Sequence, residues 1–179
     1  MKKQLTNVAR RPLLWATGVF LVFGLSLAVL PRPVRGAEAS TRVLARGGGT
    51  TIIEGGTGSP GFVPVITTVA FHAAAAGRSV IGSFECLARA PQAATGTGSA
   101  EFTVNAMYVT GQITDAKISG DTATLIGTAT ITGLGAGTAV PFTFVVRKGG
   151  PGATAVLTTN GDPHLVFNEV LLEGSFEVD

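Results

Sequence analysis

Apolar and polar residues alternate through much of the second half of the chain. In the segment 138–148 every second residue is apolar, and these residues are Val140, Phe142, Phe144 and Val146. Successive side chains of a strand point to opposite faces, so this stripe predicts a strand with one buried face. The segment 122–132 repeats the pattern, with Leu125 and Ile131 on one face and threonines on the other. Pro141 has no amide donor, which predicts an edge strand or a bulge at that position.

Turn sequences separate these segments from further alternating runs. Ser119-Gly120-Asp121 lies between the runs 112–118 and 122–132, and Asn160-Gly161 is a strong turn pair. Further strands are predicted at 65–75, 79–87, 101–110, 153–159, 165–172 and 174–178. In the segment 101–110 the predicted core face carries Phe102, Val104, Ala106 and Tyr108. The three- and four-residue apolar spacing of a helix is absent, so the chain is predicted to be all-β.

These strands predict a single antiparallel β-sandwich with Greek-key or immunoglobulin-like connections, built from about eight to ten short strands in residues 62–179. The alternative is a small closed β-barrel, in which aromatic residues line a cavity for an apolar ligand instead of filling a core. Those aromatic residues are Phe102, Tyr108, Phe142 and Phe144. The preceding segment, residues 40–61, is rich in glycine and predicts a stalk or a loose first strand followed by a loop.

Three pieces of the chain carry a resemblance to a known family. They are ISGDTATLIGTATITG at 118–133, PFTFVV at 141–146 and GGPG at 149–152. Together they resemble the post-COAP family of secreted bacterial β-domains, which share a glycine-punctuated strand, a following F-x-F/V strand and a Gly-Pro-Gly turn. The resemblance covers residues 62–179 and implies a secreted β-sandwich, without an activity or a site to carry over. The chain departs from the family at Ala153-Thr154-Ala155, where an acidic residue and an aromatic residue are expected.

Residues 1–39 have the pattern of an export signal. Basic residues at Lys2, Lys3, Arg10 and Arg11 precede an uncharged apolar stretch of 18 residues, Leu13 to Leu30. Ala37 and Ala39 form an A-x-A site, which predicts cleavage before Ser40 and a secreted or extracytoplasmic protein. The arginine pair partly matches a twin-arginine signal, but the expected serine or threonine is missing, which favours an ordinary basic region. The alternative to cleavage is an uncleaved membrane anchor, because the apolar stretch approaches the length of a membrane helix.

The basic charge of the chain belongs to this leader. Of the 13 basic and 11 acidic residues, six and one lie in residues 1–39, so residues 40–179 carry a net charge of −3. The remaining segment has no basic patch with interleaved aromatic residues, which argues against nucleic-acid binding. Cys86 is the only cysteine, which excludes an intrachain disulfide and a lipid-modified cysteine at the cleavage site.

Two groups of residues resemble cofactor or metal motifs but lack the context that these motifs need. Gly56–Gly61 matches G-x-G-x-x-G, yet β-type alternation follows it, whereas a dinucleotide loop must open a helix. The two histidines, His72 and His164, do not have the spacing of zinc ligands. Acids such as Asp162 and Glu169 add no motif, so both histidines are predicted to be packed or surface residues. No cofactor or metal site is therefore predicted.

Cys86 and three acids are the remaining candidates for catalysis. Cys86 shares a strand face with Phe84, which predicts a buried, inert thiol and not a nucleophile. Glu85, Glu101 and Glu169 could converge as the acids of a glycoside hydrolase, but nothing in the sequence selects them. No catalytic residue is therefore predicted.

Threonines predict a solvated face on one strand, with water or ice binding as an alternative that lacks the usual stacked repeats. They are Thr122, Thr124, Thr128, Thr130 and Thr132. The predicted function is an exported, non-catalytic module with a structural or binding role, whose partner is a protein, a glycan or a cell surface. Membrane contact is expected only through the leader, if it stays uncleaved. The alternatives are a secreted barrel that binds a small apolar ligand and a hydrolase with unidentified acids.

Overall fold

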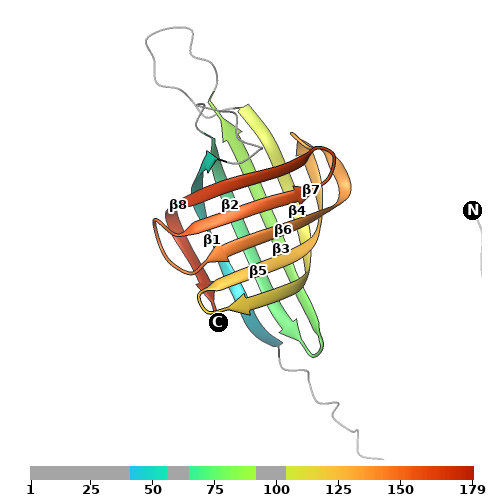
Figure 1. Cartoon of the computed structure of the whole chain (residues 1–179), viewed down its shortest axis with the longest axis vertical. Coiled ribbons are helices and arrows are strands. Elements are labelled where there is room, and N and C mark those ends of the chain that lie inside the picture. The colour runs from blue at the N-terminus through green and yellow to red at the C-terminus, as the bar shows by residue number, and fades with distance from the viewer. Residues whose placement is uncertain (1–40, 56–64, 92–103) are drawn as a thin grey trace, which may run out of the picture. The chain divides into compact units, whose positions relative to one another are not determined.

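The computed structural model describes residues 41–55, 65–91 and 104–179, and the regular structure in them is all β-strand. The eight strands are β1 (Thr41–Gly55), β2 (Ile66–Ala76), β3 (Ser79–Ala90), β4 (Val104–Ser119), β5 (Thr122–Gly133), β6 (Gly137–Arg147), β7 (Thr154–Asn160) and β8 (His164–Val178). They form one closed antiparallel barrel in chain order, in which β8 pairs back onto β1 (Figure 1). None of the described segments contains a helix long and apolar enough to cross a membrane.

The predicted all-β antiparallel fold is confirmed, and the barrel that was the alternative replaces the sandwich. Each strand pairs with its neighbours in sequence, so the connections are simple hairpins and not Greek-key crossings. Figure 1 shows β5 to β8 crossing the front of the barrel, with β1 to β4 behind them. A strand with one apolar face suits a sandwich and a barrel equally, so the alternation alone did not distinguish them. The pairing of β1 with β8 decides between the two.

The glycine-rich segment 40–61 supplies the strand that closes the barrel. β1 pairs with β2 on one side and with β8 on the other, from Ala45 opposite Val178 onward. A Cβ atom placed at Gly49 would overlap the carbonyl oxygen of Glu173, and one at Gly174 would overlap the carbonyl oxygen of Gly48. The glycines therefore let the two strands approach closely, which is a structural role that a stalk does not have.

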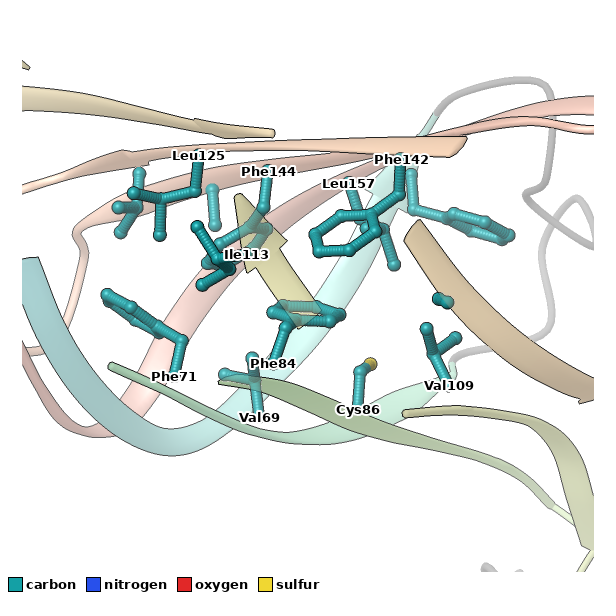
Figure 2. Packing of buried hydrophobic residues seen from close by; sticks show 14 of the residues in the cluster. Val69, Phe71, Phe84, Cys86, Val109, Ile113, Leu125, Phe142, Phe144 and Leu157 are labelled. Atoms are coloured by element: carbon teal, nitrogen blue, oxygen red, sulfur yellow. The ribbon is translucent and has the colours of Figure 1, made fainter. Parts of the chain in front are cut away.

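Phenylalanine rings fill the interior. The predicted core stripe of β6 is confirmed, because Phe142, Phe144 and Val146 are fully buried. In Figure 2, Phe71 and Phe84 point toward Phe142 and Phe144 from the opposite side of the interior. The ring centroids of Phe84 and Phe144 are 4.8 Å apart, and those of Phe71 and Phe144 are 5.3 Å apart. Packing of this kind adds favourable ring–ring contacts to the burial of apolar area.

The segments 101–110 and 112–118 were predicted as two strands, and within the described residues they form the single strand β4. Its pairing with β5 shifts between Ile113 and Asp115, which lets one long strand bend around the barrel. The predicted core face was wrong: Met107 is buried, whereas Val104 is 46% exposed and Tyr108 points outward. Apolar residues occupy both faces of this segment, so the correct face follows only from the pairing with β3 and β5.

Two further details of the strands depend on pairing. The runs 165–172 and 174–178 are one strand, β8, and the register shift between Thr50 and Thr51 lies where they meet. The β6–β7 ladder begins with Phe142 opposite Thr159, so Pro141 lies outside this ladder. The missing amide hydrogen of Pro141 therefore leaves no hydrogen bond unmade with β7. Phe102 lies outside the described residues.

Gly111 makes room for the largest rings of the core. A Cβ atom at Gly111 would lie 2.7 Å from Cε1 of Phe142 and 3.2 Å from Cβ of Ala129. Phe142 is itself fully buried and cannot withdraw without moving Phe84, whose ring centroid is 5.1 Å away. The barrel wall at β4 is therefore close-packed against the aromatic core.

Replacement of Gly111 by alanine is expected to overpack this contact and to lower the free energy of unfolding by about 1–3 kcal/mol. Gly55→Ala is the matched control, because a Cβ atom there would lie 3.7 Å from its nearest neighbour, Nδ2 of Asn168. Urea unfolding of the two variants measures the difference. Equal stability of both variants would contradict the proposed packing.

Candidate functional site

The outer face of β2 to β5 is hollowed by two adjoining depressions. Their volumes are about 640 and 610 Å³, and both are lined by Ala70 and Glu85. We call the two depressions together the outer groove. Its larger hydrogen-bonding side chains are His72, Glu85, Arg89, Asn105, Tyr108 and Gln112. These residues come from β2, β3 and β4, and threonines of β5 complete the groove.

The strand register brings these side chains together. Glu85 of β3 lies opposite Ala70 of β2 and Thr110 of β4, and the next outward pair on β3 and β4 is Leu87 with Tyr108. Residues at such diagonal positions on one face of a sheet are within reach of long and aromatic side chains. Small side chains such as Ala70 beside Glu85 leave the hollow open. The groove therefore results from the pairing of three strands, and no single segment encodes it.

Tyr108 and Glu85 form a hydrogen-bonded pair in the outer groove. The Tyr108 hydroxyl donates to Oε1 of Glu85. This hydrogen bond is the main cause that raises the pKa of Tyr108, with smaller contributions from desolvation and from the charge of Glu85. The phenol therefore stays protonated well above neutral pH, and the pair fixes the direction of the ring.

The predicted solvated threonine face of β5 is confirmed in part and lies along this groove, whereas Thr122 and Thr124 are half-buried and lie outside it. Thr128, Thr130 and Thr132 are exposed on the outer face of the barrel. Thr128 and Thr130 line one depression, and Thr132 lines the other. Their hydroxyl groups both donate and accept hydrogen bonds, so this side of the groove suits a ligand rich in hydroxyl groups.

A second polar cluster lies inside the barrel. Thr51 of β1 and Thr67 of β2 both donate hydrogen bonds to Oε2 of Glu169 on β8, the latter at 2.8 Å. Glu169 is only 3% exposed. Burial is the main cause that raises its pKa, and the two threonine hydroxyls oppose this shift by stabilising the carboxylate. We call these three residues and the adjoining Cys86 the buried polar cluster.

Cys86 is buried on the same strand face as Phe84, as predicted. Burial raises the pKa of its thiol well above the ordinary value, the charge of Glu169 raises it further, and a hydrogen bond with Thr67 opposes the shift. A thiol in this environment has little thiolate at neutral pH and is a poor nucleophile. The buried polar cluster therefore lacks an activated thiol.

Glu85 and Glu169, two of the three acids considered for hydrolysis, do not share a site. Glu85 lies in the outer groove, whereas Glu169 points into the barrel, so the wall separates them. Glu101 lies outside the described residues, as do Gly56–Gly61 and the cleavage-site residues Ala37, Ala39 and Ser40. A pair of carboxyl groups flanking one bond, as glycoside hydrolysis requires, is thus not provided by Glu85 and Glu169.

The two histidines are surface residues. His72 lies in the outer groove and His164 is exposed at the start of β8. Within the described residues, no group of three or more histidine, cysteine, aspartate or glutamate side chains could hold a metal ion.

The sequence indicates the buried polar cluster but not the outer groove. Glu169 lies between Phe167 and Leu171 on the buried face of β8, where every second residue points inward. This position in the alternating pattern predicts a buried carboxyl group. The groove left no such signal, because its residues come from separate strands. Tyr108 was also predicted to lie in the core, so the sequence did not indicate that it lines the outer groove.

Glu169→Gln is expected to remove the part of the decrease in unfolding free energy with rising pH that comes from the Glu169 carboxyl. The pKa of Glu169 is raised in the folded chain from its ordinary value of 4.5. The native state therefore retains a proton that the unfolded state releases. The protonated carboxyl makes its full contribution to the free energy of unfolding below pH 4.5. This contribution is lost as the pH rises through the raised pKa of the native state. The slope reaches at most about 1.4 kcal/mol per pH unit.

The glutamine variant has no proton to lose at this position, so its stability relative to the wild type is expected to increase across this pH window. Urea unfolding at a series of pH values measures the difference, with Glu173→Gln as the control at an exposed position of the same strand. Parallel curves for Glu169→Gln and the wild type would contradict a shifted carboxyl.

Similarity to known proteins gives no guide to the function of this barrel. Comparisons of the chain with protein-family models, with curated proteins and with solved structures find no match. The function has to be argued from the geometry of the two polar clusters, of which only the outer groove is open to a ligand.

Proposed function

We propose that this protein is an exported, non-catalytic binding module and that its outer groove binds a glycan. The observation that carries the proposal is the open groove of hydrogen-bonding side chains around the Tyr108–Glu85 pair. A sugar ring presents hydroxyl groups that donate and accept, and an apolar face formed by its C–H groups. Amide, carboxylate and hydroxyl side chains match the first, and an oriented aromatic ring matches the second.

Protein partners are less well supported by the same surface. Each of the eight described strands pairs on both sides along part of its length, so a peptide could add as a further strand only at short stretches such as residues 114–119 of β4. An amphipathic helix requires a groove lined mainly by apolar side chains. In the outer groove, the apolar surface of Ala70 and Leu87 is interrupted by hydrogen-bonding side chains such as Asn105, so it does not form the continuous apolar stripe that such a helix needs. These features favour a glycan over a peptide.

The two alternatives predicted from the sequence have less support. An apolar ligand inside the barrel would have to displace rings that already pack together, since Phe142 and Phe144 are fully buried in contact with Phe84. A hydrolase would need acids that converge, and Glu85 and Glu169 lie on opposite sides of the wall. A binding role without bond cleavage fits both observations.

Export is the second part of the proposal. It is supported by the basic and apolar pattern of residues 1–39. The mass of the exported protein is expected to correspond to a chain that begins at Ser40. Recovery of the full-length chain in the membrane fraction would instead favour the uncleaved anchor.

Tyr108→Ala is expected to weaken glycan binding by about fivefold or more, because truncation of an aromatic anchor removes both the ring contact and its hydrogen bond. The purified protein is first screened against a panel of soluble oligosaccharides, and the affinity of each ligand found is then measured by calorimetry. Leu172→Ala is the control, since Leu172 is 48% exposed and lies outside the outer groove. No binding across the panel, or equal affinities of the two variants, would refute the proposed site.

A further inference from the structure

Arg89 lies at one end of the outer groove and has no acidic partner among the described residues. It is exposed on β3 and lines the same depression as Tyr108 and Asn105. In the described part of the chain, the ion pair that forms is between Arg46 and Glu177, on the seam of β1 and β8. No acid of the described residues therefore neutralises the guanidinium of Arg89, which can pair with an anion that enters the groove.

The groove separates its positive and negative groups along one strand. Glu85 and Arg89 lie on the same face of β3, four residues apart, which corresponds to about 13 Å of extended strand. This distance exceeds the width of a single sugar ring. Glu85 already accepts the Tyr108 hydroxyl, so its charge stays at the middle of the groove. A ligand that spans both positions therefore meets a carboxylate at one sugar unit and a guanidinium at another.

We propose that the outer groove takes an acidic glycan, in which the carboxylate of a uronic acid binds Arg89 and a neighbouring neutral sugar packs against Tyr108. This inference rests on the proposed glycan-binding function and specifies its ligand. The planar fork of an arginine matches a carboxylate through two parallel hydrogen bonds. Asn105 lies opposite Arg89 in the β3–β4 register, and its amide can donate to the same anion.

Glu85 sets the spacing of charge along this ligand. A second carboxylate beside Glu85 would be repelled, because two like charges in a partly desolvated groove raise each other's free energy. The barrel also carries a net negative charge in residues 40–179, so attraction of an anion has to be local to Arg89. The preferred ligand therefore alternates acidic and neutral sugars and is not a uniform polyuronate.

The test uses oligosaccharides with and without their charge. Hexasaccharides of hyaluronan and of unsulfated chondroitin alternate a uronic acid with a neutral sugar, and carboxyl reduction of each removes the charge but keeps the ring. Calorimetry measures the binding of these four compounds and of oligogalacturonate to the purified protein. The acidic hexasaccharides are expected to bind about three- to tenfold more tightly than their reduced forms, as for a partly solvated charge-assisted contact.

Arg89→Gln is expected to abolish this preference, because glutamine has no charge with which to pair the carboxylate. Arg78→Gln is the matched control, because Arg78 is exposed in the β2–β3 turn and lies outside the outer groove. The preference is also expected to diminish as the salt concentration increases. Thermal unfolding of both variants confirms that neither substitution changes the fold.

The outcomes separate the inference from the proposed function. Equal binding of acidic and reduced forms would overturn the acidic ligand and leave glycan binding in place. A preference that survives Arg89→Gln would overturn the role of Arg89, and tighter binding of oligogalacturonate than of the alternating hexasaccharides would overturn the role of Glu85. Absence of binding to all five compounds, and to the neutral panel, would overturn both the inference and the proposed function.

Discussion

Closure of the barrel through the pairing of β1 with β8 is the constraint on which the rest of the structure depends. Without it, the two strands would be edges with unpaired amide and carbonyl groups, and the ring core would be open on one side. The close approach of backbones at Gly49 and Gly174 allows this pairing. On the outer side of the seam, Arg46 and Glu177 form an ion pair at 2.6 Å. Inside, Glu169 joins the seam to β2 through Thr67.

The same strands build the interior and the outer groove from alternate residues. On β3, Phe84 and Cys86 point into the barrel, while Glu85 and Arg89 point into the groove. The outer side chains therefore start from backbone that is held by a packed core. A binding surface on such rigid strands loses little conformational entropy when a ligand binds, which favours recognition by a few well-placed contacts.

The sequence predicted most of the strands but not the way in which they assemble. The stripe of β6 and the threonine face of β5 were predictable, because in these segments one face is much more apolar than the other. Strand β4 has apolar residues on both faces, so Tyr108 was placed inside when it lies outside. The glycines of β1 were compatible with a stalk or a loose first strand, and the strand is what forms, because its glycines meet a partner strand more than 100 residues away. The outer groove depends on the register of several strands, which a single segment does not specify.

The seam also has a consequence for how the chain comes to be folded. β1 is the first described strand and β8 is the last, so the contacts that seal the molecule join its most distant segments. The other ladders join strands that are neighbours in sequence, so the seam is the pairing that closes the longest loop and costs the most chain entropy. A chain that has emerged from the ribosome only as far as β7 can pair β1 with β2, but the other edge of β1 is still unpaired. Because β8 is the last described strand, synthesis has to reach it before the barrel can close.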